Sequence, residues 1–132
     1  MMELTIGGVV HQFNFGMGFM REINKSMKMP IDGLPGAMQN MGLQYKVGRL
    51  YDNDVEALVE ILTAANIGMN PRVTVPMLDA FIDDPATDID ALFSEVLDFL
   101  SKSNATKKVA AAVREMVDKE LARQAALAAA TE

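Results

Sequence analysis

The sequence has no cysteine, no tryptophan and a single histidine, His11. The lack of cysteine excludes disulfides, thiolate catalysis and cysteine-ligated zinc sites, and it suits a reducing compartment. One histidine also supplies too few ligands for an ordinary zinc centre. We therefore interpret His11 as a strand residue with a satisfied ring nitrogen, and we expect no metal and no cofactor.

Long hydrophobic runs are also missing. No apolar stretch approaches the roughly 20 residues that a membrane-spanning helix needs. Glu3 and Thr5 interrupt the apolar residues near the N-terminus, so no secretory signal is expected. These absences predict a cytoplasmic protein that does not enter a membrane.

Basic residues are few relative to acidic ones. The 12 Lys and Arg oppose 18 Asp and Glu, which gives a formal net charge of -6. Because such a chain is repelled by phosphate backbones, nucleic-acid binding is not expected. Apolar residues are plentiful, at 50% of the 132 residues, and 11 residues are methionine. One domain over residues 1–132 is predicted, with methionines that either fill its core or line an adaptable binding surface.

The chain opens with two alternating segments joined by Gly7-Gly8. Both glycines can adopt positive φ, so residues 3–15 are predicted to form a β-hairpin. Two further glycines flank Met17, and a strand followed by glycines and a helix is the arrangement of many nucleotide sites. A dinucleotide fingerprint would need a small residue in place of Arg21, and no Gly-Lys-Ser/Thr is present. The glycines are therefore interpreted as a sharp turn into a helix.

The spacing of apolar residues predicts about five helices after the hairpin. Residues 27–36 contain two prolines and two glycines and are expected to form a loop, followed by a helix over residues 37–50. Asn53, with Glu56 three residues later, resembles a capping box at the start of the next helix.

Thr74 and Thr87 are expected to cap two more helices. The acidic run at residues 83–90 is explained by a helix stop and a helix start, because an EF-hand loop needs a central glycine and a final glutamate. A long last helix is predicted within residues 104–132, with an Ala-rich end that is mobile or contacts another chain. The predicted fold class is mainly α with a small N-terminal β-hairpin (α+β), a helical core over residues 16–103 and a long C-terminal helix.

Three segments, taken in order, resemble a known family. They are LTIGGVVHQFNFGMGFMREINK at residues 4–25, DNDVEALVEILTAAN at residues 52–66 and DIDALFSEVLDFLSKSNATKK at residues 88–108. Together they resemble the tail assembly chaperones of long-tailed phages and prophages of Gram-positive bacteria. The resemblance spans residues 3–110.

This resemblance implies a protein that is not an enzyme and that binds the tape measure protein, a long helical chain that sets tail length. Such a chaperone keeps its partner soluble while tail tube protein assembles around it. The resemblance also implies action in the host bacterial cytoplasm, absence from the mature virion, and a homo-oligomer.

A protein that holds exposed apolar helices needs an adaptable apolar surface within a polar exterior. Methionines gather in the first third of the chain, so we expect six of them to bind the partner: Met17, Met20, Met27, Met29, Met38 and Met41. Burial of all six inside the monomer would contradict this hypothesis.

Two other functions remain open at this point. The chain could be a structural or accessory protein of a phage tail or neck that is retained in the virion. A small helix-turn-helix regulator is the second alternative, although the acidic balance disfavours the basic recognition face that it would need. No nucleophile and base stand in a recognisable pattern, so an enzyme is not expected.

Overall fold

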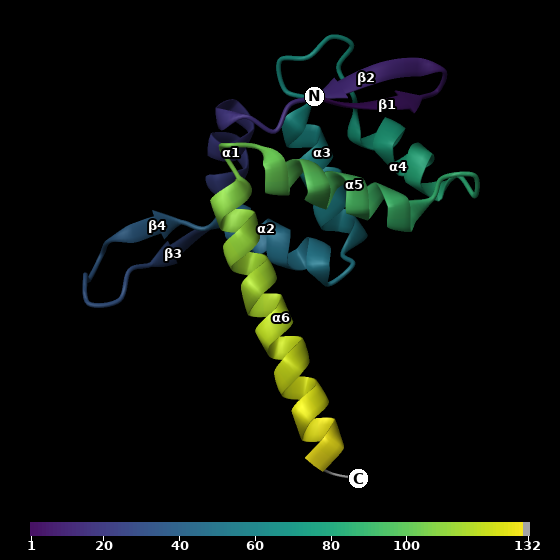
Figure 1. Cartoon of the computed structure of the whole chain (residues 1–132). Helices are drawn as coiled ribbons and strands as arrows, with labels where there is room; N and C mark the ends of the chain where they lie inside the picture. The colour runs from purple at the N-terminus through teal and green to yellow at the C-terminus, as the bar shows by residue number, and fades with distance from the viewer. Residues whose placement is uncertain (131–132) are drawn as a thin grey trace.

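The computed structural model describes residues 1–130. Its helices pack around a buried central helix, and its strands form two separate antiparallel hairpins (Figure 1). In chain order the elements are β1 (Met2–Ile6), β2 (Val9–Phe13), α1 (Met17–Asn24), β3 (Lys28–Pro30), β4 (Met38–Asn40), α2 (Gly42–Tyr51), α3 (Val55–Ala65), α4 (Val75–Asp83), α5 (Ile89–Lys102) and α6 (Lys107–Ala130). The predicted fold class is confirmed, with six helices in residues 1–130 where about five were expected.

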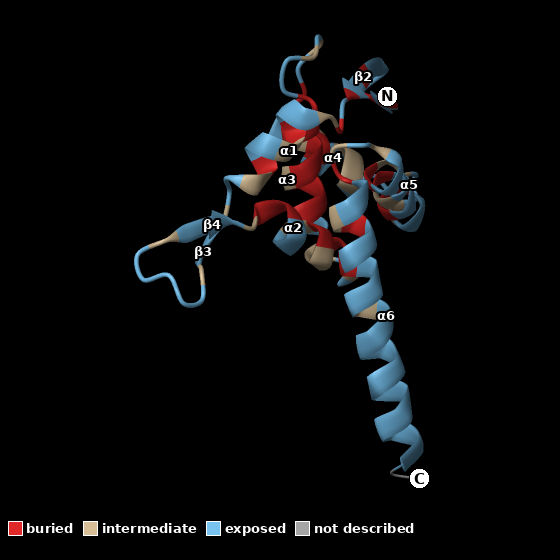
Figure 2. Ribbon diagram, turned by 60° about the vertical axis from the view of Figure 1, so that its left-hand side comes forward, coloured by how far each residue is buried: buried red, intermediate tan, exposed pale blue. Residues whose placement is uncertain are grey.

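α3 lies at the centre because it is apolar on nearly every side. Its buried residues are Ala57, Leu58, Val59, Ile61, Leu62, Ala64 and Ala65. α1, α2 and α4 all contact it, and Figure 2 shows most of it as buried among the other helices. A helix with so little polar surface is stable only within such a shell.

The N-terminal hairpin forms as predicted, with β1 and β2 paired around the Gly7-Gly8 turn. These glycines have φ values of 59° and 79°, a region that strains residues with side chains. His11 in β2 is buried, and its Nδ1 lies 3.1 Å from the carbonyl oxygen of Val9. The interpretation of His11 as a strand residue with a satisfied ring nitrogen is therefore confirmed.

One buried amide joins three parts of the fold. Asn66 caps the C-terminal end of α3 and is fully buried. Its Nδ2 donates to the carbonyl oxygens of Gln12 in β2 (3.0 Å) and of Pro71 (3.4 Å). Its Oδ1 accepts from Arg72 Nη1 (2.8 Å) and from the backbone N–H of Val73 (2.6 Å). The side chain therefore holds the hairpin, α3 and the segment before α4 in one arrangement.

The segment between α1 and α2 differs from its prediction. Residues 27–36 were expected to be a loop, but they contain β3, which pairs with β4 in a second hairpin. The helix expected over residues 37–50 therefore begins only at Gly42. The prolines and glycines of this segment predict a loop. The strands themselves give no sequence signal against that prediction, because each has only three residues and no alternating pattern.

Two helix caps also differ from their predictions. Asp54, and not Asn53, caps α3 by accepting two backbone N–H bonds at 3.0 and 3.3 Å. Asp88, and not Thr87, caps α5 through a bond of 3.0 Å, while Thr87 donates to the carbonyl oxygen of Phe81. In both cases two cap-forming residues are adjacent in the sequence, so spacing alone did not identify the cap.

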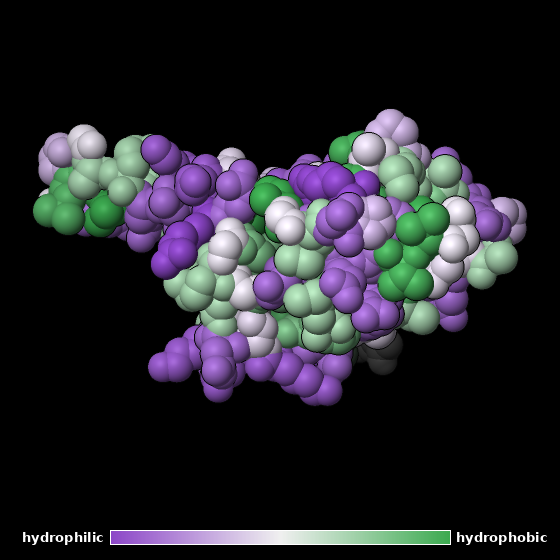
Figure 3. All heavy atoms as spheres, turned by 90° about the horizontal axis from the view of Figure 1, so that it is seen from above, coloured by the Kyte–Doolittle hydropathy of each residue, from purple (hydrophilic) through white to green (hydrophobic). Residues whose placement is uncertain are grey.

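α6 and the β3–β4 hairpin project from the body. Ala110 and Val113 are the buried residues of α6, which contacts α2 and α5, whereas residues 118–130 are exposed on all sides (Figure 2). Figure 3 shows the hairpin as a lobe at one side of the molecule, with hydrophobic surface at its outer end. No helix within residues 1–130 has the length and apolar character needed to cross a membrane.

Replacing Asn66 with alanine is expected to lower the free energy of unfolding by about 2–4 kcal/mol, because Val73 N–H and the Gln12 carbonyl lose their buried partner. Asn104→Ala is the matched control, since Asn104 is exposed in the turn before α6. Urea unfolding followed by circular dichroism measures both variants. Equal unfolding midpoints would show that the amide does not have this role.

Candidate partner-binding groove

A groove of about 650 Å³ opens between α2, α6 and the β3–β4 hairpin. It extends along α6 from Ala112 to Gln124. The α6 wall is an apolar row of Val113, Met116, Val117 and Leu121, and the α2 wall includes Tyr45, Gly48 and Arg49. Methionines at and beside the hairpin complete the lining: Met27, Met29 and Met41. We call this feature the methionine groove.

The position of α2 in this groove depends on the glycine at its first residue. A Cβ at Gly42 would overlap the carbonyl oxygen of Ile23 near the end of α1. The missing side chain therefore lets α1 and α2 approach more closely than any other residue would allow. Beside this contact, the N–H of Met41 donates to the carbonyl oxygen of Met27 at 2.8 Å, which brings both methionines to one end of the groove.

The methionines are mainly a surface feature of this protein. Met2 is the one methionine in the buried core of residues 1–130. None of the six methionines predicted to bind a partner belongs to that core, and Met29 and Met38 are 41% and 52% exposed. The outcome that would have contradicted the hypothesis, burial of all six, is not observed.

The six methionines do not form one surface. Three of them line the methionine groove, as described above, and three lie elsewhere. Met17 lines a small depression beside α3, Met20 packs partly against the core, and Met38 is exposed on β4. A direct role in partner binding stays a prediction for all six.

The sequence prediction did not include the α6 wall of the groove. Met116 and Leu121 are 69% and 58% exposed, although both belong to the apolar stripe of the last helix. The sequence signal for them is the helical spacing of Val113, Met116, Val117 and Leu121, which places these apolar residues on one face. Without the tertiary structure, nothing in the sequence indicated that the stripe faces Met27 and Met29.

Two basic side chains at or near the rim of the groove, Arg49 and Arg123, are paired with carboxylates, whereas the carboxylate of Asp52 also lines the groove and belongs to no ion pair within residues 1–130. Arg49 donates to Asp54 Oδ2 from Nε (2.7 Å) and Nη2 (2.6 Å), and its guanidinium lies 5.5 Å from the centre of the Tyr45 ring. The hydrogen bond from Arg49 lowers the pKa of Asp54. On α6, Arg123 donates to Glu120 at 2.6 Å and lowers the pKa of that carboxyl group. Because only Arg49, Asp52 and Glu120 are charged among the lining residues, the apolar walls make up most of the groove.

The chemistry available in the groove is that of a binding surface. No group of three His, Cys, Asp or Glu side chains within residues 1–130 could hold a metal ion. An apolar trough between two helices, with polar groups along its rim, has the form that accepts one face of an amphipathic helix. The unbranched methionine side chains allow such a trough to fit different apolar sequences.

A family model described as phage tail assembly chaperone protein, TAC, matches residues 3–115. The chain belongs to this family. The match covers nearly the whole of the body, including α2 and the first turns of α6, and it confirms the resemblance found in the sequence. No curated protein and no solved structure gives a significant match. A tail assembly chaperone acts on another tail protein, so a partner-binding surface is the functional feature to seek in this chain.

Two glycines of α2 allow a matched test of how the chaperone positions this helix. Gly42→Ala is expected to lower the free energy of unfolding by about 1–3 kcal/mol, because the added methyl group displaces the end of α1. At Gly48 no atom lies within 4 Å of an added Cβ, so Gly48→Ala should raise stability by up to about 1 kcal/mol through helix propensity. Thermal unfolding compares the two, and a shift in the same direction for both would contradict this account.

The Arg49–Asp54 pair predicts that the chaperone loses stability in acid. Because the folded pKa of Asp54 is lowered, the ionised carboxylate stabilises the fold above the ordinary Asp pKa of about 4. This contribution is lost as pH falls from that value through the lower folded pKa. Asp54→Asn keeps a cap acceptor without the charge, so its deficit in melting temperature should be largest near neutral pH and shrink in acid. A deficit that is constant with pH would contradict this assignment.

Proposed function

We propose that this chaperone binds the tape measure protein of a phage tail and keeps it soluble until tail tube protein assembles around it. No chemical step is involved, so the chain is not an enzyme. The observation that carries the proposal is the methionine groove between α2 and α6. A naked tape measure helix exposes long apolar stripes, and one face of such a helix fits an apolar groove with few charges at its rim.

The composition of the groove suits a partner whose sequence changes along its length. Branched side chains select one complementary surface, whereas methionine repacks around different apolar side chains. Tyr45 adds a large amphipathic ring on the opposite wall from Met116, both of them exposed in the free chain. The groove is therefore expected to tolerate many apolar segments and to discriminate little among them.

The size of the groove implies that many copies act on one partner. The α6 segment from Ala112 to Gln124 spans about 18 Å, which matches about three turns of a bound helix. A tape measure protein is many times longer, so we propose that copies of the chaperone bind along it and associate as a homo-oligomer. The exposed residues 118–130 of α6 offer a surface for such contacts. We place this work in the host bacterial cytoplasm, before the virion is complete.

Leu121→Glu tests the groove directly. The chaperone is co-expressed with a phage tape measure protein, and the soluble tape measure protein that co-purifies is measured. Leu121 is 58% exposed, so the variant should fold normally, while a charge in the apolar wall should reduce co-purification by about tenfold or more. Leu34→Glu is the matched control: Leu34 is 57% exposed but lies outside the groove lining, and its variant should bind within about twofold of the parent.

Three outcomes would contradict the proposal. The first is that the tape measure protein is equally soluble without the chaperone. The second is that Leu121→Glu and Leu34→Glu both bind it as well as the parent chain does. The third is that both variants bind it equally poorly. Detection of this chain as a constant component of purified particles would instead favour a structural tail or neck protein.

A further inference from the structure

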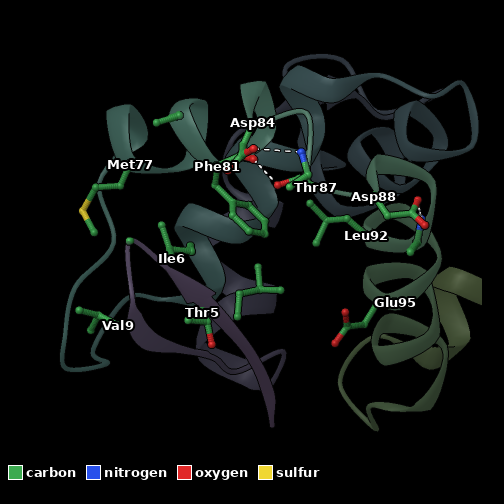
Figure 4. A pocket seen from close by; sticks show the side chains of 15 residues that line it. Thr5, Ile6, Val9, Met77, Phe81, Asp84, Thr87, Asp88, Leu92 and Glu95 are labelled. Atoms are coloured by element: carbon green, nitrogen blue, oxygen red, sulfur yellow. Dashed lines mark hydrogen bonds between the residues drawn. The ribbon is translucent and has the colours of Figure 1, made fainter.

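A second groove, separate from the methionine groove, lies beside the first strand. Its volume is about 770 Å³, and it is bounded by β1, α4 and α5. Figure 4 shows Phe81 and Leu92 pointing into it from the two helices, across from Thr5 and Ile6 of β1. Its floor is apolar, because Leu92 and Ile6 belong to the buried core and Phe81 packs against it. No residue lines both grooves.

The β1 wall of this groove is an open strand edge. Within residues 1–130 β1 pairs only with β2, and Ile6 and Val9 flank the two-residue turn as a bonded pair. In an antiparallel ladder the bonded pairs alternate with pairs whose N–H and C=O groups point outward. The outward groups of β1 are therefore those of Glu3 and Thr5, and of these two residues Thr5 lines the groove.

The two edges of the hairpin are not equivalent. On the β2 edge, the outward carbonyl oxygen of Gln12 accepts the hydrogen bond from Asn66, so the end of α3 covers that edge. On the β1 edge, the described part of the chain provides no backbone partner for Glu3 or Thr5. An exposed edge with unpaired backbone groups is a template for one more strand.

The electrostatic field around the groove is negative. Residues 73–101, which include α4 and most of α5, contain no Lys, Arg or His, and their acidic residues are Asp79, Asp83, Asp84, Asp88, Asp90, Glu95 and Asp98. Three of these line the groove: Asp84, Asp88 and Glu95. Asp84 and Asp88 each accept one local backbone N–H bond, which leaves a carboxylate oxygen on each for a cation.

We propose that this β1 groove binds an extended, cationic peptide segment of a partner protein by strand addition to β1. The backbone of the segment pairs with the outward groups of Glu3 and Thr5. Alternate side chains then point in two directions, because successive residues of a strand face opposite sides. Apolar side chains enter the floor at Phe81 and Leu92, and lysine or arginine side chains reach the acidic rim.

The negative field decides which extended segment fits. An acidic or neutral strand would gain the backbone bonds but no attraction from the rim, whereas each lysine near Glu95 or Asp88 gains a favourable charge interaction. Because the rim is exposed to solvent, this part of the affinity should weaken as salt concentration rises. Apolar–cationic alternation is therefore the pattern expected in the partner.

A fluorescein-labelled six-residue peptide of alternating lysine and valine, capped at both ends, is the probe for this groove. Fluorescence anisotropy measures its binding to the full chain. Thr5→Pro removes an outward N–H of β1 without removing a ladder bond, so it should weaken binding by about tenfold or more. Val10→Pro is the matched control, because Val10 is opposite Thr5 and its N–H points outward on the β2 edge; binding should stay within about twofold.

A second variant tests the charge independently of the strand edge. Glu95→Lys should weaken binding of the lysine peptide several-fold and flatten its salt dependence, and it does not alter the hairpin. A peptide of alternating glutamate and valine should bind at least about tenfold more weakly than the lysine peptide. Circular dichroism tests whether each variant is folded. If Thr5→Pro is unfolded, the strand edge is tested in the parent chain instead, by measuring whether the bound peptide protects the Thr5 amide from hydrogen exchange.

The proposal is overturned if the lysine peptide does not bind, if Thr5→Pro and Val10→Pro weaken it equally, or if the glutamate peptide binds as well. It is also overturned if the peptide binds without protecting the Thr5 amide. None of these results bears on the methionine groove, which shares no residue with this site, so the two proposals can fail separately.

Discussion

The amide of Asn66 is the interaction on which the arrangement of this chaperone depends. Its four hydrogen-bond partners come from β2 and from the segment before α4, and the amide itself ends the central helix. A polar group buried in an apolar interior is costly unless it is paired. Movement of any one of these segments would leave a donor or an acceptor unpaired, so the hairpin, α3 and α4 keep one mutual position.

Three contacts extend this fixed arrangement to the groove-forming helices. Ser103 Oγ donates to the carbonyl oxygen of Phe15 at 2.5 Å, and Phe15 packs edge-on against Phe19 with ring centres 5.1 Å apart. These contacts attach the turn before α6 to the junction of the hairpin and α1. Gly42 in turn brings α2 against the end of α1. These contacts hold α2 and the start of α6 against the hairpin and α1, while the unbranched methionine side chains in the groove can adopt several conformations.

The two grooves differ in the kind of partner segment that they suit. The methionine groove has apolar walls and few charged lining residues, and we propose it for one face of a helix. The groove beside β1 combines open backbone groups with an unbalanced negative rim, which fits an extended basic strand. With both proposed sites, a chaperone would hold an elongated helical partner and engage a second, extended segment at the same time. Because the grooves share no lining residue, occupation of one does not directly block the other.

Local sequence patterns determined the elements whose causes are themselves local. The Gly7-Gly8 turn, the Thr74 cap, the stripe of α5 and the length of α6 follow from turn chemistry and helical spacing, and all were predictable. Three family segments also identified the class of protein before its fold was known. The six candidate methionines are clustered in the first third of the sequence, and such clustering is also a local property.

Only the tertiary structure decided what these elements build together. It joined Met27 and Met29 to Met116 and Leu121, which lie far along the chain from them, and it separated Met17, Met20 and Met38 from this group. It also selected Asp54 and Asp88 as caps and left the β1 edge open beside an acidic helix pair. The physical reason is that periodicity and capping act within a few residues, whereas a groove depends on where distant segments dock. That docking is set by long-range contacts such as Asn66 with Gln12 and Gly42 with Ile23, which no local pattern encodes.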